Sequence, residues 1–479
     1  MRRPRRRESP EASSRHIPTE MVRRILLKLP ARDAIRSSRV SKQFRDIVKE
    51  PSFPKHHAAE HAVPSPGGGA EALLVTVNRV PGGGLDPNIY SVTSSKHMYR
   101  LTDSMAMSHV ATNVCNGFIC FGPGAFGVAP AVLCNPATGE TLALPAAPPF
   151  KDDMDRYLFL LGFSPPTGEY KLFRISFRES CGGHYVDVCT LGDRRGWRRL
   201  PHLVPLRQIY GVPPVFADGK LYVVTGQFQF TNHPEGILVV DVASETLCTY
   251  GLPDMFVGPR GDTLVDVLEL HGQFCLALNY AIVSPDRPKV EFWVMPRLGQ
   301  LHGGNHMRLD WVLRYTFYVE VDHVSRKAAA TPYVWGKHYK DQPRAAWLDE
   351  DEILCYMLDG CLYKYNTRDH SRLDDFVAWN EKVQLPTTPS PSNRRWNIYG
   401  GYRPSLLSPL TFALPSSQDD EDNGRFEHDM LRALRPSKLI RRPPNDHIGQ
   451  DARGFSAEPT FKFNADDKCD KDLKERKLP

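Results

Sequence analysis

The feature that most constrains this chain is a short helical unit at residues 17–53 that is too small to be stable alone. Its apolar residues recur at the three-to-four spacing of one helix face over residues 21–29, and Pro30 ends that run. Two further amphipathic helices are expected before Pro51 breaks the pattern. Units of about 40 residues usually need a metal, a disulfide or a partner, and this one contains no Cys or His. We therefore interpret it as half of an interface.

The same unit contains a specific order of residues. The motifs, in order along the chain, are Ile17-Pro18-x-Glu20, Ile25-Leu26, Leu29-Pro30, Val40-Ser41-Lys42-x-Phe44-Arg45 and Pro51-Ser52-Phe53. This order is similar to the F-box of plant F-box proteins. The family usually has Leu where Ile17 stands, and commonly has Cys and Trp where Ser41 and Phe44 stand.

The resemblance implies a role in ubiquitination. In that family the helices dock on a Skp-type adaptor, which links them to cullin and RING subunits, and the downstream domain captures the target protein. Carried over to this chain, the adaptor-binding residues are expected to be Ile17, Pro18, Ile25, Leu26, Leu29, Pro30, Val40 and Phe44. The chain is thus expected to be no enzyme itself, and its partners would carry the chemistry.

The charge of the chain argues against a general affinity for nucleic acid. With 61 basic and 55 acidic side chains the net charge is only +6, and five Arg among the first seven residues supply most of it. We expect residues 1–16 to form a disordered basic arm, with a nuclear-import signal as the alternative interpretation. The composition of 41% apolar residues over 479 residues allows two or three globular domains.

The first residues and the pattern of cysteines lead us to expect a protein of the cytoplasm, the nucleus or both. No apolar run opens the chain, and the ten Cys never form a Cys-x-x-Cys pair. We interpret the cysteines as reduced and buried. Residues 104–139 carry no charged side chain, but repeated Gly, Pro and Asn make a lipid-exposed helix there unfavourable, so no membrane partner is expected.

Residues 72–405 show short strands separated by turns. One turn signature places a polar residue before Gly, at Asn116-Gly117, Asp218-Gly219, His271-Gly272 and Asp359-Gly360. Asn-Gly and Asp-Gly favour two-residue hairpin turns, because both central residues must accept positive φ. A second signature puts a short polar side chain at a strand end, where it can bond to the following backbone. Its four copies begin at Cys134, Phe163, Val240 and Tyr365, and in each copy the short polar side chain is the next residue.

Further antiparallel pairs are expected at residues 186–201 and 289–317. The whole region would then hold about six units of the size usual for propeller blades, and ring closure would hide strand edges. The phrases GFICF, CNPATGE, GFSPPTGEYKLFRI, WRRLP, DGKLYVV, ILVVDVASE, VEFWVM and DGCLYKYN occur in this order. They are similar to the F-box-associated domain, which favours a propeller-like fold. A β-sandwich is the alternative.

The expected organisation is therefore α+β with several domains. A basic arm (1–16), a three-helix F-box (17–56), a linker (57–71), a β-domain (72–405) and a disordered tail (406–479) follow one another. Within the tail, residues 426–434 could form a helix of two turns that serves as a docking segment.

Searches for catalytic, cofactor and metal sites give weak signals. The glycine string at residues 122–127 lacks the strand-to-helix context of a phosphate loop. His56, His57 and His61 are interpreted as surface residues of the linker, and the acidic run 349–352 as a solvated strand edge. We expect no cofactor, no metal and no catalytic residue.

Two rival functions remain. Nine basic against four acidic residues at 17–53 allow a basic helical unit that binds DNA, fused to a propeller. However, the basic residues are spread around all three expected helices and do not form one recognition face. A propeller enzyme acting on glycans or by oxidation is third, because no carboxylate pair is evident.

Overall fold

The computed structural model describes residues 17–61 and, with several internal gaps, residues 70–413. All of these residues belong to one compact unit, Met1–Pro436. The expected basic arm (1–16) and the expected helix at 426–434 lie outside the described residues.

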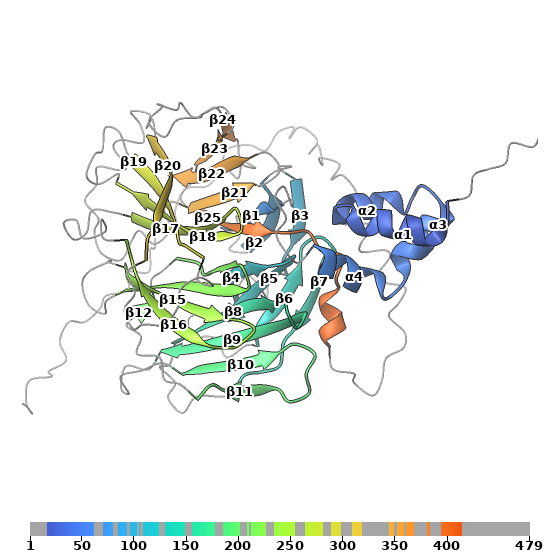
Figure 1. Ribbon diagram of the computed structural model, residues 1–479, viewed down its shortest axis with the longest axis horizontal. Helices are drawn as coiled ribbons and strands as arrows, with labels where there is room; N and C mark the ends of the chain where they lie inside the picture. Colours follow the sequence, from blue (N-terminus) through green and yellow to red (C-terminus); the bar gives the residue numbers. More distant parts are fainter. Residues whose placement is uncertain are drawn as a thin grey trace, which may run out of the picture. The chain divides into compact units, whose positions relative to one another are not determined.

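The N-terminal part consists of four helices (Figure 1). They are α1 (Thr19–Lys28), α2 (Ala31–Ser37), α3 (Lys42–Lys49) and α4 (Phe53–Glu60). Prolines set the first boundaries, since Pro18 and Pro30 stand directly before α1 and α2, where a missing N–H costs no hydrogen bond. The sequence predicted three helices and a linker from residue 57. The structure corrects this, because α4 continues to Glu60 and packs on α1 and α3.

The remainder forms six sheets in the described part of the chain (Figure 1). The first two contain β25 (Arg394–Tyr402), β1 (Glu71–Arg79), β2 (Leu85–Ser91) and β3 (Lys96–Arg100), then β4 (His109–Cys115), β5 (Phe118–Pro123), β6 (Val132–Asn135) and β7 (Glu140–Ala143). The third contains β8 (Arg156–Ser164), β9 (Glu169–Phe177), β10 (Val186–Thr190) and β11 (Trp197–Arg199).

The fourth sheet has five strands and the last two have four each. They contain β12 (Gln208–Ile209), β13 (Val215–Ala217), β14 (Lys220–Gly226), β15 (Pro234–Asp241) and β16 (Leu247–Gly251), then β17 (Leu264–Leu270), β18 (Gln273–Asn279), β19 (Lys289–Val294) and β20 (Val312–Tyr318), and finally β21 (Arg344–Leu348), β22 (Ile353–Leu358), β23 (Cys361–Asn366) and β24 (Glu381–Val383). The predicted pairs at 186–201 and 289–317 are confirmed as β10–β11 and β19–β20.

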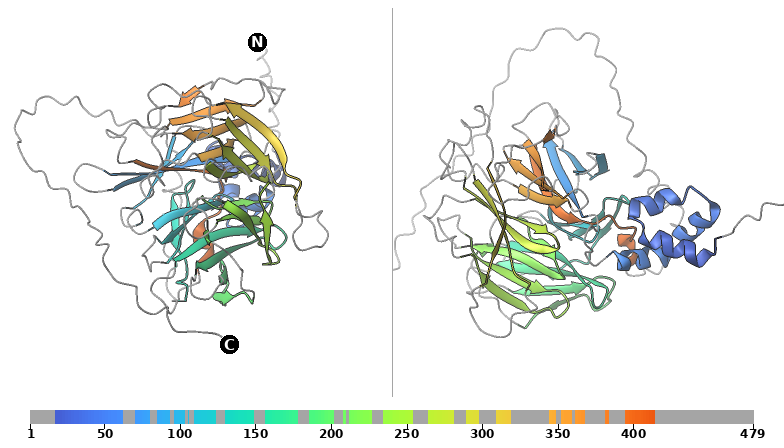
Figure 2. Two further views of the ribbon diagram at one scale, coloured as in Figure 1. Left: turned by 90° about the vertical axis from the view of Figure 1, so that its left-hand side faces the viewer. Right: turned by 45° about the horizontal axis from the view of Figure 1, so that its top comes forward.

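The sheets form a closed six-bladed propeller, as the sequence predicted in preference to a sandwich. Strands β4, β8, β13, β17, β21 and β25 contact one another between blades, so β13 rather than β12 is the inner strand of the fourth sheet, and β25 is the inner strand of the first blade. Figure 2 shows the blades in two further views. β25 pairs antiparallel with β1 in a register that includes Leu74↔Ile398, and it also contacts β4 and β21 of the two adjacent blades. The last strand thus closes the ring, so the propeller has no unpaired innermost edge at this seam.

The predicted two-residue turns are confirmed at three of four positions. Asn116-Gly117, Asp218-Gly219 and His271-Gly272 all have positive φ at both residues, and each joins two paired strands. His271 adopts φ 52° although it is a weaker signal than Asn or Asp. The fourth pair, Asp359-Gly360, lies outside the described residues, but the register Leu358↔Cys361 leaves two residues for that turn.

Polar side chains at strand ends also close turns as expected. Asn135 Oδ1 accepts from the backbone N–H groups of Ala137 and Thr138, and Asp241 Oδ1 accepts from Ser244 N–H at 2.9 Å. Asn135 has a second role, because its Nδ2 donates to the carbonyl oxygens of Ser405 and Leu407 at 3.0 and 2.9 Å. It therefore ties the second blade to the segment that follows β25.

That segment corrects the predicted start of the tail at residue 406. Residues 403–413 are ordered along the propeller and include the 3₁₀ helix η4 (Pro409–Phe412). Leu407 is buried, and the Phe412 ring packs edge-on against Phe118 and Tyr170. The described β-domain therefore ends at Ala413 rather than at 405.

Apolar side chains of adjacent blades pack together to form the core. Trp347 of β21, for example, shares one buried cluster with Phe292 of β19. Six of the seven described cysteines are buried and all seven are free thiols. Burial raises the pKa of Cys120 to about 12, so this thiol stays protonated. In the described part of the chain, the helices are too short or too polar to cross a membrane.

Candidate functional site

The F-box helices leave a set of large apolar side chains uncovered. Ile17, Met21, Ile25 and Val40 are 50%, 57%, 51% and 74% exposed, and we call these four residues the apolar surface. Met21 and Ile25 stand four residues apart on α1, which places them on one face, and Ile17 lies just ahead of the helix, four residues before Met21. Gln43 Nε2 donates to Ile17 O and Thr19 Oγ1, so the start of α3 lies beside the start of α1. An uncovered face of this kind marks an interaction site.

Another face of the same helices forms a core. Val22 and Leu26 of α1 are fully buried, together with Ile35, Ile47 and Phe53 from the other helices. The core explains why α1 carries two apolar stripes, one turned inward and one left for a partner. Ser41, which stands where the family commonly has Cys, caps α3 because its Oγ accepts from Phe44 N–H at 3.2 Å.

The eight predicted adaptor-binding residues fall into three groups. Ile17, Pro18, Ile25, Pro30 and Val40 are exposed, whereas Leu29 and Phe44 are half-buried against the core. Leu26 is fully buried in the F-box core. Met21, which the prediction did not include, is exposed midway between Ile17 and Ile25 in a series at four-residue intervals that is visible in the sequence.

Three cations border the apolar surface. Arg39, Lys42 and Arg45 are exposed on the turn before α3 and on α3 itself, and no ion pair is recorded for them among the described residues. We call them the basic rim. Most other cations of the F-box are engaged by carboxylates, as in the pairs Arg23–Glu50, Arg24–Glu20, Lys28–Glu60, Arg32–Glu71 and Arg36–Asp33.

The F-box is joined to the propeller through packed contacts. Leu406, from the segment after β25, is 2% exposed and belongs to the F-box core. Arg32 of α2 pairs with Glu71 of β1 at 3.1 Å, and Ser91 Oγ donates to the same carboxylate at 2.8 Å. Ala58 of α4 packs on the cluster that contains Leu407. These contacts, which we call the junction, hold the F-box at one end of the propeller strands.

His57 corrects the interpretation of the three histidines as surface residues. It is 1% exposed, its Nε2–H donates to Leu29 O at 2.8 Å, and its ring lies 4.4 Å from that of His61. The pKa of His57 is lowered to about 4, mainly by burial and in part by the nearby His61, while the Leu29 carbonyl and Glu60 oppose the shift. The ring is therefore neutral at physiological pH and serves the F-box fold.

We expect acid to destabilise the F-box through His57. The unfolded chain takes up a proton near pH 6.5, whereas the folded chain does so only near pH 4, so stability falls as the pH drops through this window. The loss at pH 5 should be about 2 kcal/mol. Hydrogen exchange of residues 19–48, corrected for intrinsic rates, would measure it. His57→Gln should flatten the dependence, whereas the exposed control His56→Gln should keep it; equal slopes in both would contradict this account.

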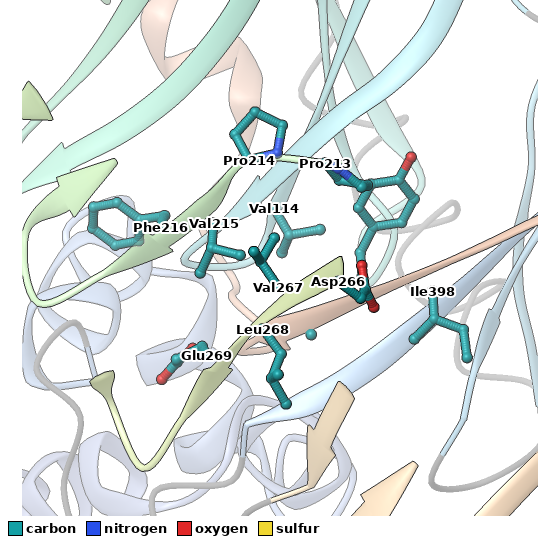
Figure 3. Close-up of a pocket in the computed structure, with 12 residues that line it drawn as sticks. Val114, Pro213, Pro214, Val215, Phe216, Asp266, Val267, Leu268, Glu269 and Ile398 are labelled. Carbon is teal, nitrogen blue, oxygen red and sulfur yellow. The ribbon is translucent and has the colours of Figure 1, made fainter. Parts of the chain in front are cut away.

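The propeller axis contains a small cavity. It has a volume of about 20 Å³ and is lined by residues 213–216, 266–269 and 398–400 together with Val114 (Figure 3). Space of this size holds about one water molecule, whereas pockets for organic ligands begin near 300 Å³. Glu269, which lines it, is paired with the buried Arg403 at 3.1 Å. The cavity is therefore not a candidate site for a small-molecule substrate.

The described residues add no support for a metal or phosphate site at the glycine string, the histidines or the acidic run. No group of three or more His, Cys, Asp or Glu side chains among the described residues is placed to hold a metal. Gly122 stands in β5, while residues 124–127 of the glycine string and 349–351 of the acidic run lie outside the described residues.

Comparison with known proteins agrees with this arrangement. Residues 15–56 match the F-box domain, and residues 85–300 match the F-box associated beta propeller domain. Two F-box proteins of Arabidopsis thaliana are each 25% identical to this chain, over 299 and 310 residues. The matches cover 59% and 61% of this chain.

The alignments also cover only part of the length of each relative. They span 62% of the first relative and 71% of the second. Among solved structures, TolB from Acinetobacter baumannii aligns with 65% of this chain and 67% of its own length. The sequence identity is 11% and the TM-score is 0.35, which is too low to support a conclusion about this chain. The two domain matches, their order along the chain and the relatives lead to one conclusion: the chain belongs to the F-box proteins in which an F-box is followed by an F-box-associated β-propeller domain.

Proposed function

We propose that this chain is the substrate-recognition subunit of a Skp-cullin-F-box ubiquitin ligase complex. The F-box docks on a Skp-type adaptor, and the propeller binds a target protein. Cullin and RING subunits reach the chain through the adaptor and bring the charged conjugating enzyme. Holding the target there replaces a bimolecular encounter with an effectively intramolecular one, so the chain itself performs no chemistry.

The observation that carries this proposal is the apolar surface. Four large apolar side chains remain at least half exposed on a helical unit whose core is otherwise filled. Their exposure has no use for folding, since Val22, Leu26 and Ile35 already supply the buried contacts. A protein partner that covers them would gain apolar burial at the centre of its interface.

The junction adds a fixed geometry. Because Leu406, Glu71 and Ala58 connect the F-box to the propeller, the adaptor and the target would be held at a defined separation. The junction lies at the end of the propeller where β1 begins and β25 ends. The tight turn at Asn116-Gly117 lies at the same end of the propeller. We propose that the target binds at the other end of the strands, away from the F-box. We place the complex in the cytoplasm, the nucleus or both.

The alternative, a DNA-binding unit, is weakened by how the cations are used. Five of the nine cations in residues 17–53 are already paired with carboxylates, and among the described residues the three of the basic rim form a small group for which no ion pair is seen. Phosphate-dominated binding needs more contacts than this and falls steeply with salt.

The test is a titration of the full chain with a purified Skp-type adaptor and, separately, with duplex DNA, each at 0.15 and 0.5 M NaCl. We expect the adaptor to bind at both salt concentrations, because apolar burial is little affected by screening. DNA should bind weakly at 0.15 M and be lost at 0.5 M. Tighter binding of DNA than of the adaptor at 0.15 M would overturn the proposal in favour of its alternative.

A further inference from the structure

The three cations of the basic rim have one nearby F-box carboxylate, Asp46, which is exposed on α3 four residues after Lys42 and cannot balance all three charges. Four other acidic residues of the F-box, Glu20, Asp33, Glu50 and Glu60, are already paired with other cations. Arg39, Lys42 and Arg45 have no recorded ion pair in the described chain, and they border exposed apolar side chains such as Val40. A ligand that fits this surface therefore combines several negative charges with an apolar stripe.

One segment of this chain has that combination. Asp419, Asp420, Glu421 and Asp422 form an uninterrupted acidic run, which is followed by an apolar series. That series is Phe426, Met430 and Leu434 at the four-residue intervals of one helix face, with Leu431 three residues before Leu434. The segment lies outside the described residues, and its role was not accounted for by the functions proposed above.

The described chain ends close to the F-box. Leu406 belongs to the F-box core, and Leu407 and Phe412 pack in the cluster that also includes Ala58 of α4. The acidic run begins six residues after Ala413, and Phe426 stands thirteen residues after Ala413. Thirteen residues span up to about 43 Å, whereas a helix is about 10–12 Å thick and the ten residues of α1 are about 15 Å long. The segment can therefore reach the far side of the F-box.

We propose that residues 419–434 bind the basic rim and the apolar surface of their own chain, so that the adaptor must displace them. The four carboxylates would pair with Arg39, Lys42 and Arg45, and Phe426 and Met430 would cover part of the apolar surface. The regulatory half of this proposal rests on the proposed adaptor function, whereas the binding of the segment to the F-box does not.

The expected effect follows from population arithmetic. An intramolecular segment that is bound nine times out of ten lowers the apparent affinity of a competitor about tenfold. Because charge pairs on the surface are screened by salt, the effect should shrink to about twofold at 0.5 M NaCl. A partner would need enough affinity to displace the segment, so weak and non-productive binding to the apolar surface would be prevented.

The first experiment compares full chains in adaptor binding at 0.05 and 0.5 M NaCl. One variant carries Asp419→Asn, Asp420→Asn, Glu421→Gln and Asp422→Asn. The matched control removes four carboxylates further along the tail, through Asp466→Asn, Asp467→Asn, Asp470→Asn and Asp472→Asn. We expect the first variant to bind the adaptor about tenfold more tightly than the wild type at low salt, and the control to be unchanged. Equal affinities of the wild type and the first variant at both salts would overturn the proposal.

The second experiment needs no adaptor. A labelled peptide of residues 416–436 is titrated into the full chain that carries the four substitutions at 419–422. Adding Arg39→Gln, Lys42→Gln and Arg45→Gln should weaken peptide binding at least tenfold. Adding Lys55→Gln, Arg194→Gln and Arg297→Gln, three exposed cations elsewhere, should leave it unchanged. A peptide that binds both chains equally, or neither, would contradict the assignment of the surface.

The two experiments separate the two proposals. A chain that captures the peptide through the basic rim but never binds the adaptor would sink the proposed function and leave the segment contact in place. Sedimentation of the wild-type chain tests the remaining occupant, a second copy. A dimer that is lost on neutralising residues 419–422 would show that the segment acts between chains, which would overturn the intramolecular form.

Discussion

Placing charges on the apolar surface should abolish adaptor binding without unfolding the protein. We expect the triple variant Ile17→Asp, Met21→Asp and Ile25→Asp to lose at least 100-fold in affinity for a Skp-type adaptor, about 3 kcal/mol, because three buried anchors would become unpaired carboxylates in the interface. All three side chains are at least half exposed in the free chain, so its thermal unfolding should change little. Calorimetric titration of the adaptor would measure the loss.

The matched control uses apolar side chains that are equally exposed but lie on the propeller. Val110 of β4 and Val312 of β20 are 54% and 55% exposed, and their replacement by Asp adds the same kind of charge. This control should bind the adaptor as the wild type does. Undiminished binding by the triple variant would show that the adaptor uses another surface.

Truncation of Leu406 should loosen the F-box although this residue lies about 350 residues further along the chain. Leu406 is 2% exposed in the F-box core, so Leu406→Ala removes buried methyl groups and leaves a cavity beside Val22 and Leu26. A cost of about 3 kcal/mol to the local stability of the F-box is expected from comparable substitutions. Hydrogen exchange of α1, α2 and α3 would report it as faster opening at unchanged protection of the propeller strands.

Its control stands four residues away in the same segment. Leu410 is 50% exposed in η4, and Leu410→Ala should cost less than about 0.5 kcal/mol. The comparison also decides how the protein can be divided. If Leu406→Ala leaves F-box exchange unchanged, the F-box folds independently of the propeller, and the junction described above has no energetic role.

The helices, turns and propeller could be predicted because they depend on local patterns. Three-to-four spacing marked α1, and positive φ is demanded at Asn116-Gly117 and Asp218-Gly219 wherever a two-residue turn joins two strands. The number of blades followed from counting such units. The choice of β25 as the closing strand did not, because its partner β1 lies more than 300 residues away in the sequence.

The spacing of apolar residues in α1 could not separate its buried face from its exposed face. Both of its stripes are apolar, so the spacing could not tell that Leu26 turns inward while Met21 remains exposed. Residues 403–413 were missed for a different reason. Their composition resembles that of a tail, and their order depends on distant groups, such as the Asn135 side chain that donates to two of their carbonyl oxygens. Likewise, the burial of His57 depends on the Leu29 carbonyl, which lies 28 residues earlier.

The most direct test of the central claim is a mass-spectrometric comparison of proteins that co-purify with two full chains. One is the wild type, and the other carries Ile17→Asp, Met21→Asp and Ile25→Asp. We expect the wild type to bring down a Skp-type adaptor with cullin and RING subunits, and the variant to lose all three while it retains the proteins bound by its propeller. Recovery of the adaptor and cullin with both chains, or with neither, would contradict the account of a propeller that presents targets through its F-box.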